Sequence, residues 1–370
     1  MTDTDAPDLL TLLQPQEETI CEFGDIILVA DDGFYPTLKI RVSSCIIAMS
    51  SKPLKALFSN KYSECKFAEE RSADKPHEVA LKDAPVPLKH LCRLLHHQYP
   101  ISDKDDENEL SPSMLLDLAV IADKYDCVDA LKLPTDALLA RHVDEDFFFQ
   151  DGELDILTAA SYLLDQPQHF RRFTRQMVLN ENHICAKTFH QQSLDILSYD
   201  LVNLLQSQQN LARIRLTEEV TGLINDFTEA ARKVHREELA IKLLSGLARE
   251  ELWPLKLTKA TLGLHLWRLE RVEIPIISTE EQIPGPGSSY RSEDDWDAGI
   301  ASTSRLLNAP NHRTVIACAN EVCRLCVGAC LQCIKRPDYT QEHEHDPWGE
   351  IDDEFAVQKF SMSRSLGWSD

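Results

Sequence analysis

The residues with the clearest potential for chemistry are five cysteines near the C-terminal end of the chain, followed by two histidines. The cysteines are Cys318, Cys323, Cys326, Cys330 and Cys333, and the histidines are His343 and His345. Four of the cysteines form two C-x-x-C units, and thiolate sulfur and imidazole nitrogen are ligands that zinc favours. Zinc binding and thiol redox chemistry are therefore the first activities to weigh.

The predicted secondary structure argues against one site with four cysteine ligands. Periodicity predicts a single helix from about Arg313 to Ile334, in which Cys323 and Cys333 lie about 15 Å apart at about 1.5 Å per residue. Two sulfurs on one zinc ion are at most about 4.6 Å apart. The spacings instead place the four cysteines within about 80° of one helix face, near Ile316. Because cysteine is readily buried as a small hydrophobe, we interpret this stripe as facing a core or a partner, and we predict no metal or cofactor.

A break at Gly328 would allow a different arrangement. It would release Cys330, Cys333, His343 and His345 to form a Cys₂His₂ metal site, which is the alternative metal interpretation. Redox sensing by the thiols is the other alternative. Either would make the chain a metal- or thiol-dependent regulator.

Other residues that could act in catalysis lie on predicted helix surfaces. His96 and His97 are adjacent and point to different faces of a helix, so at least one is expected in solvent. Asp123 and Asp126 are expected to solvate a helix face or to pair with Lys or Arg. The sequence has no phosphate-binding glycine loop, no H-E-x-x-H and no G-x-S-x-G motif. We therefore predict that the protein is not an enzyme.

The charge balance disfavours polyanionic partners. The 370 residues include 38 Lys and Arg against 61 Asp and Glu, a formal net charge of −23 at pH 7, which repels phosphate backbones and anionic membranes. No apolar run reaches the roughly 20 residues that span a bilayer, and the first residues lack a signal-peptide pattern. The 11 cysteines, an odd number, favour a reducing compartment. We expect an intracellular protein, cytoplasmic or nuclear or both, that contacts neither membranes nor nucleic acid directly.

The N-terminal third predicts a small α/β domain that begins with a β-hairpin. Asp25–Ala30 is a β-rich run, Asp31–Gly33 is a turn signal, and a second run follows in which apolar and basic residues alternate. The apolar members of that second run are Leu38, Ile40 and Val42. The alternation predicts a hairpin with one buried face.

Helices and a third strand follow the hairpin. Ser43 or Ser44 can cap a first short helix, and Ser51 with the proline two residues later can open a second. Glu78–Leu81 reads as a strand. A later helix begins at Ser111–Pro112 and carries Ala119 and Ala122, which allow close helix packing.

The rest of the chain is predicted to be mostly helical. Apolar positions recur at helical spacing from about 153 to 277, with breaks expected near Pro167, His183, Gln209–Asn210 and Pro254. Trp253 and Trp267 lie in a leucine-rich stretch and are candidate partner-binding residues, although helical core is the simpler interpretation. The predicted organisation is a flexible acidic tail at 1–19, an α/β domain at 20–142, a helical domain at 143–280, a linker at 281–312, a cysteine-rich helix at 313–336 and an acidic mobile tail at 337–370.

The order and composition of the N-terminal elements resemble those of the BTB/POZ domain, in the divergent form common in fungal proteins. The resemblance covers residues 20 to 142, about a third of the chain. The residues that carry it are Gly24–Val29, Ile40–Ile47 with Ser51 and Phe58, Phe67–Glu69, and Leu118–Cys127. The last segment is the most specific, and the resemblance implies an α/β BTB/POZ-like domain followed by a helical, partner-presenting region.

That resemblance also implies a function in binding rather than catalysis. Members of the family form homodimers, and many bridge substrates to cullin-type ubiquitin ligases. The expected role is a protein-interaction module that dimerises and presents a helical surface to another protein, with a cullin adaptor as an alternative. Phe67 and Glu69 match the apolar-x-Glu pattern that some cullin-binding members use, so they are candidate partner-binding residues. Phe67 packing beneath its own loop is the simpler interpretation.

Overall fold

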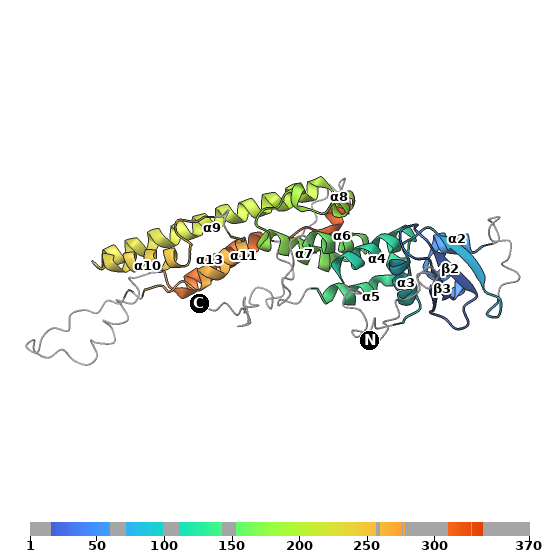
Figure 1. Cartoon of the computed structure of the whole chain (residues 1–370). Helices are drawn as coiled ribbons and strands as arrows, with labels where there is room; N and C mark the ends of the chain where they lie inside the picture. Colours follow the sequence, from blue (N-terminus) through green and yellow to red (C-terminus); the bar gives the residue numbers. More distant parts are fainter. Residues whose placement is uncertain are drawn as a thin grey trace, which may run out of the picture. The chain divides into compact units, whose positions relative to one another are not determined.

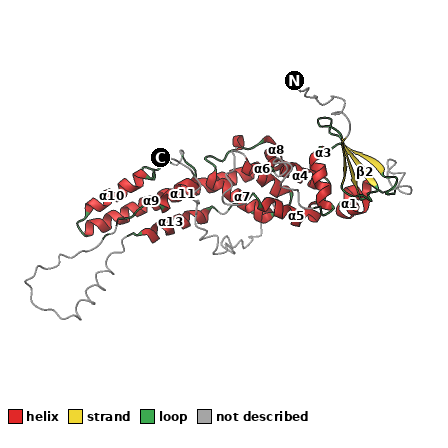
Figure 2. Ribbon diagram, turned by 60° about the horizontal axis from the view of Figure 1, so that its bottom comes forward, coloured by secondary structure: helices red, strands yellow, loops and turns green. Residues whose placement is uncertain are grey.

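The computed structural model of the chain describes residues 16–59, 72–98, 111–142, 153–256, 260–275, 277, 310–326 and 328–335. The protein is rich in α-helix and has a small mixed sheet near its N-terminal end, as the sequence predicts (Figures 1 and 2). Contacts divide the chain into two compact units. The sheet unit comprises the described parts of Met1–Thr174, Phe189–Ser198 and Cys330–Pro337, and the helical unit those of Arg175–Thr188 and Tyr199–Ala329.

Four strands form the sheet, in the order β1-β3-β2-β4. Their bounds are β1 Gln16–Thr19, β2 Ile26–Ala30, β3 Leu38–Val42 and β4 His77–Leu81. β2 and β3 are antiparallel, whereas β1 runs parallel to β3 and β4 runs parallel to β2. The predicted hairpin and its turn are confirmed, because β2 and β3 both alternate buried and half-buried residues along their length.

β1 occupies residues that the sequence assigned to a flexible tail. Its residues, Gln-Glu-Glu-Thr, show no apolar alternation, and most are exposed. The strand is held by its backbone: the N–H of Gln16 donates to the carbonyl of Thr37 at 3.2 Å, and the N–H of Ile20 donates to that of Arg41 at 3.0 Å. Backbone pairing of this kind leaves no side-chain pattern in the sequence.

Helices complete the core of the sheet unit. Their bounds are α1 Ser44–Ser50, α2 Lys52–Leu57, α3 Pro85–Leu95, α4 Pro112–Lys124, α5 Val128–Ala140, α6 Glu153–Leu163, α7 Pro167–Asn180, α8 Gln191–Ile196 and α14 Leu331–Lys335. α4 packs against α6. Ala119 and Ala122 of α4 and Ala159 and Ala160 of α6 are all fully buried. Small side chains let two helices approach closely, so the predicted role of the α4 alanines is confirmed.

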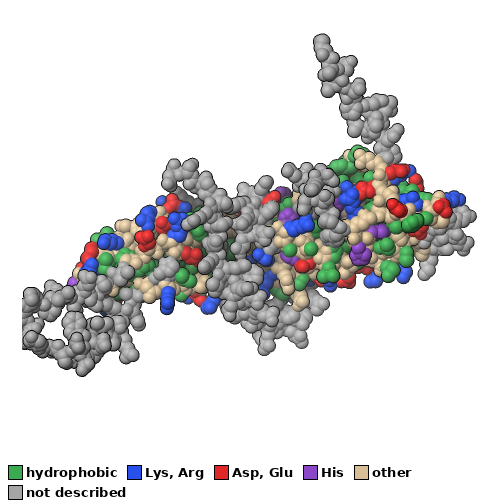
Figure 3. All heavy atoms as spheres, turned by 90° about the horizontal axis from the view of Figure 1, so that it is seen from below, with side chains coloured by type: hydrophobic (Ala, Val, Ile, Leu, Met, Phe, Trp, Pro, Cys, Tyr) green, Lys and Arg blue, Asp and Glu red, His purple; other side chains and the backbone are tan. Residues whose placement is uncertain are grey.

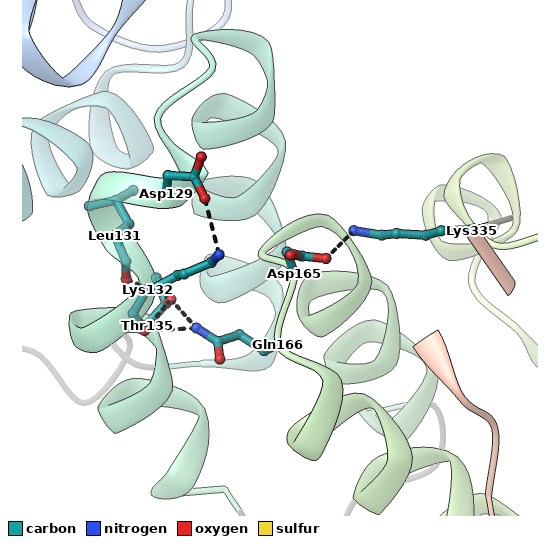
Figure 4. Close-up of polar contacts among 7 residues, drawn as sticks. All are labelled: Asp129, Leu131, Lys132, Thr135, Asp165, Gln166 and Lys335. Carbon is teal, nitrogen blue, oxygen red and sulfur yellow. Dashed lines mark hydrogen bonds and ion pairs between the residues drawn. The ribbon is translucent and has the colours of Figure 1, made fainter. Parts of the chain in front are cut away.

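The turn between α6 and α7 contacts two other helices of this unit, α5 and α14 (Figure 4). Gln166 Nε2 donates to the carbonyl of Lys132 at 2.7 Å and to Thr135 Oγ1 at 2.9 Å, which ties the turn to α5. Lys335 of α14 donates to Asp165 at 2.9 Å. These contacts place the short α14 segment against the α6–α7 turn, within the sheet unit.

The helical unit contains the end of α7 from Arg175 and several further elements. These are a 3₁₀ turn at Ala186–Thr188, α9 Tyr199–Lys233, α10 Glu237–Arg249, α11 Leu262–Glu270 and α13 His312–Leu325. Three expected breaks are confirmed, since α7 begins at Pro167, α7 ends before His183, and Pro254 lies between α10 and α11. α10 and α13 pack along the long α9.

The expected break at Gln209–Asn210 is wrong, because α9 runs through it without interruption. Gln209 is fully buried, and its Nε2 donates to the carbonyls of Val178 and Glu181 at 3.2 and 2.8 Å. One turn later, Arg213 donates to the carbonyl of Asn182. Gln209, the first residue of this polar pair, therefore donates to carbonyls at the C-terminal end of α7, where the last carbonyls have no amide donor within their own helix.

The single helix expected from Arg313 to Ile334 is also wrong. α13 opens with a capping box at Asn311 and ends at Leu325, and α14 begins at Leu331. Gly328 lies between them with φ of +74°, a left-handed conformation that glycine adopts readily. The break at Gly328 that was considered as an alternative is present.

Candidate interaction surface

The N-terminal end of α1 is fixed by side chains from distant elements. Asp25 Oδ1 accepts from the N–H of Ser44 at 2.8 Å, and Asp25 Oδ2 accepts from Ser44 Oγ at 2.6 Å. The N–H of Ser43 donates to His96 Nε2, from the end of α3, at 3.0 Å. Ser43 is the N-cap residue, as expected, but its side chain makes no capping bond, and Asp25 supplies the carboxylate instead.

Gly24 allows the chain to approach β3 closely next to this cap. A Cβ atom at Gly24 would lie 2.6 Å from the carbonyl oxygen of Val42 and 2.9 Å from that of Cys21. The Gly-Asp pair at the start of the family-like segment therefore has two local functions. Glycine admits the backbone of β3, and aspartate caps α1.

Large apolar side chains are exposed on and beside α1. Met49 is 84% exposed and lies one turn after the exposed Cys45, on the helix face opposite the buried Ile47. Phe23, two residues before the capping Asp25, is 80% exposed. We refer to these three exposed residues, Phe23, Cys45 and Met49, as the α1 patch. Exposed apolar side chains held on a fixed backbone are suited to binding another protein.

The β2–β3 turn exposes two further aromatic residues. Asp31 Oδ1 accepts from the N–H of Gly33 at 2.9 Å, and Asp32 Oδ1 accepts from those of Phe34 and Tyr35 at 3.0 and 3.1 Å. Phe34 is 91% exposed. The Asp-Asp-Gly signal predicts this turn. The exposed aromatic residues at its tip were not predicted, although they follow that signal directly in the sequence.

The most specific family-like segment, Leu118–Cys127, holds the interior of the sheet unit together. Tyr125 donates its hydroxyl to the buried Asp83 at 2.5 Å, and Lys124 pairs with the same carboxylate at 2.5 Å. Ser51, which caps α2 as predicted, donates its Oγ to the carbonyl of Tyr125 at 2.6 Å. Burial, and then the hydrogen bond to Asp83, raises the pKa of Tyr125. These contacts give Ser51, Asp83 and Tyr125 a structural role in the unit.

Trp253 and Trp267 lie in the helical unit and are both partly exposed. Trp253 precedes Pro254 in the connection between α10 and α11, whereas Trp267 lies on α11 with the guanidinium of Arg271 4.5 Å from its ring centre. Leu262, Leu266 and Leu269 form the buried face of the same helix. The two tryptophans are therefore on the surface and not in the helical core.

The described C-terminal cysteines are poorly suited to metal or redox chemistry. Cys318 and Cys326 are buried and Cys323 is half-buried. Burial raises the pKa of Cys323 to about 11 and that of Cys326 to about 12, so both thiols are protonated near neutral pH. Among the described residues, no group of three or more potential ligands could hold a metal ion. Ile316, expected near the stripe, is partly exposed.

Several candidate residues fall outside the described part of the chain. Phe67, Glu69, His343 and His345 lie in segments that the structure does not describe, and Cys333 lies in α14 without a described side chain. Cys330 is half-buried in the sheet unit. Of the adjacent histidines, His97 is exposed and His96 is half-buried, as expected for residues on different helix faces.

The described surface carries mixed charge. On the face in Figure 3, lysine and arginine side chains are interspersed with aspartate and glutamate. Within the described ranges, no helix is both long and apolar enough to cross a membrane.

Comparisons of the chain with protein-family models, with curated proteins and with solved structures all found no match.

Proposed function

We propose that the chain is a protein-interaction module in which a BTB/POZ-like domain at residues 20–142 joins two copies, while the helical region binds a further protein. The order of elements supports this proposal: a hairpin, two short helices, a strand parallel to the first hairpin strand, and then α3, α4 and α5. Among the described family-like residues, Asp25, Ser51 and Tyr125 each make a hydrogen bond to a residue distant in the chain.

The observation that carries the proposal is the exposure of Met49 on a helix whose start is fixed in place. Hydrogen bonds to Asp25 and His96 hold the N-terminal end of α1, so its apolar face is presented without further ordering. A preorganised surface loses less conformational entropy when it binds. A second copy of the same patch is its proposed partner.

A binding role also fits the polar pairs of the sheet unit better than catalysis does. His169 Nε2 donates to Asp136 Oδ1 at 2.8 Å. His190 donates to the buried Asp155 through its backbone N–H at 2.6 Å and through its ring Nδ1 at 3.1 Å. Within the described residues, no hydrogen bond joins either ring to a hydroxyl or thiol. The His–Asp pairs thus lack the nucleophile that a hydrolytic triad requires.

The test is the solution mass of the full chain by light scattering over a range of concentrations, with Met49→Asp as the variant. Leu133→Asp on α5 is the matched control, because Leu133 is 85% exposed in the same unit. The expected result is that Met49→Asp weakens association and Leu133→Asp does not. Equal behaviour of both variants, or a monomeric wild-type chain at every concentration, would contradict the proposal.

Recruitment of a cullin is a further proposal that rests on the family resemblance. Replacing Phe67 and Glu69 with alanine should abolish binding of a purified cullin N-terminal domain while the circular dichroism spectrum stays unchanged. Binding that survives the double substitution would show that Phe67 and Glu69 do not recruit the cullin.

A further inference from the structure

β4 lies at one edge of the sheet, and its outward backbone groups have no partner among the described residues. The N–H of His77 donates to the carbonyl of Asp25 at 3.0 Å, and the carbonyl of Leu81 accepts from the N–H of Asp31 at 3.0 Å. In a parallel pair with this register, alternate residues of a strand bond to the same neighbour, so His77, Val79 and Leu81 pair with β2. Glu78 and Ala80 point their N–H and C=O groups the other way, where no described residue pairs with them.

The opposite edge of the sheet is less suited to pairing with a copy of itself. On β1, the outward backbone groups belong to Glu17 and Thr19, because Gln16 and Ile20 bond to β3. Antiparallel registers centred on Glu17 or Glu18 would place that glutamate opposite its own copy. Like charges directly opposite each other destabilise a strand pair.

β4 is complementary to itself in one antiparallel register. When Ala80 lies opposite Ala80 of a second copy, Glu78 lies opposite Lys82, and two-fold symmetry makes this ionic contact twice. The Glu78 side chain is 52% exposed and so is accessible, with Lys39 of its own chain 2.6 Å away on its other side. On the other face of the sheet, Val79 would meet Leu81. Opposite charges and apolar pairs across strands both stabilise such a contact.

From this edge we infer that β4 is a docking strand for β4 of a second copy of the chain, paired antiparallel about Ala80. Backbone hydrogen bonds would form between Ala80 and Ala80 of the second copy, and between Glu78 of each chain and Lys82 of the other. These bonds would join two four-stranded sheets into one. An exposed strand edge is a template for this kind of association. The small side chain of Ala80 leaves the centre of the contact unobstructed.

This contact differs from the α1 patch, since it uses the edge of the sheet rather than a helix face. Two distinct two-fold contacts on one chain lead to assemblies larger than a dimer. Wild-type protein at high concentration should therefore exceed the mass of two chains. Disabling either contact should leave a dimer formed through the other, and disabling both should leave a monomer.

The main test uses Ala80→Pro in the full chain. Proline removes an N–H that no described residue of the sheet unit accepts. Edge strands tolerate proline, so the fold is expected to persist by circular dichroism. Ala80→Thr keeps the N–H and is the control. Light scattering over a concentration series should show that Ala80→Pro raises the dissociation constant of the β4 contact about tenfold or more, since it removes both central hydrogen bonds. Ala80→Thr should remain close to wild type.

Charge exchange tests the register itself. Glu78→Lys and Lys82→Glu should each weaken association, and the double variant should restore it, because lysine would again lie opposite glutamate. Assembly that is unchanged by Ala80→Pro, or a double variant no better than the single ones, would overturn the inference. A wild-type dimer lost in Met49→Asp but intact in Ala80→Pro would overturn the β4 contact alone, and the reverse would overturn the α1 contact alone.

Discussion

His96 Nε2 accepts a hydrogen bond from the backbone N–H of Ser43 at 3.0 Å, which joins the end of α3 to the start of α1. The other ring nitrogen, Nδ1, lies 2.8 Å from the carbonyl of Cys92, which can only accept. The ring is therefore neutral, with its proton on Nδ1. Protonation of Nε2 would replace the acceptor by a donor and break the link to α1.

This link predicts a stability that falls in mild acid. Burial lowers the pKa of His96 below its ordinary value of 6.5, so the unfolded chain takes up a proton at this site first as pH falls. The contribution of neutral His96 is fully present above about pH 6.5 and is lost progressively below it, until the folded state is also protonated. Urea unfolding at pH 7.5, 6.5 and 5.5 measures this dependence.

The variant His96→Gln isolates that contribution from other histidines. Glutamine does not titrate, so the loss of stability between pH 7.5 and 5.5 should be smaller in this variant than in wild type. His183→Gln is the control, because His183 is an exposed histidine of the helical unit, away from the contact with Ser43. If stability changed with pH equally in His96→Gln and wild type, protonation of His96 would not be coupled to its hydrogen bond with Ser43.

Gly24 and Gly222 should respond to alanine in opposite directions. A Cβ at Gly24 would clash with the backbone of β3 at 2.6 Å, so Gly24→Ala should destabilise the chain by about 1–3 kcal/mol. Gly222 lies within α9 with nothing within 4 Å of an added Cβ, so Gly222→Ala should stabilise by about 0.5–1 kcal/mol. Midpoints of urea unfolding check both values. If Gly24→Ala left the free energy of unfolding unchanged, the backbone before β2 would be able to move away from Val42.

How far sequence could predict this structure depended on whether each signal was local. Ser51 caps α2 three residues away from the amide it accepts, and that cap was predicted. Asp25 caps α1 from 19 positions earlier in the chain, and no local pattern could assign it. Gly328 shows the intermediate case. Its break was considered, but helical periodicity on both sides favoured a continuous helix. The exposure of the α1 patch could not be predicted either, because exposure depends on which residues from distant parts of the sequence pack nearby.

Gln209 should contribute strongly to the helical unit because it serves a helix other than its own. Gln209→Ala would leave the carbonyls of Val178 and Glu181 without their buried donor, which should destabilise the chain by about 1–3 kcal/mol. Asn210→Ala is the matched control, since Asn210 is exposed on the next position of the same helix. Alanine is the better helix former, so this control should be neutral or slightly stabilising. Equal effects of the two substitutions would contradict the capping role of Gln209.

Cys45 offers a direct report on the α1 patch. It is exposed, whereas Cys92 and Cys326 are buried, and burial raises the pKa of Cys326 to about 12. Iodoacetamide at pH 7.5 should therefore alkylate Cys45 readily in the native chain and reach Cys92 and Cys326 only after unfolding. If two copies meet through α1, the alkylation rate of Cys45 should fall as protein concentration rises through the association range. Met49→Asp should abolish that protection and Ala80→Pro should not. A Cys45 rate that stays constant while light scattering shows assembly would place the contact elsewhere on the chain.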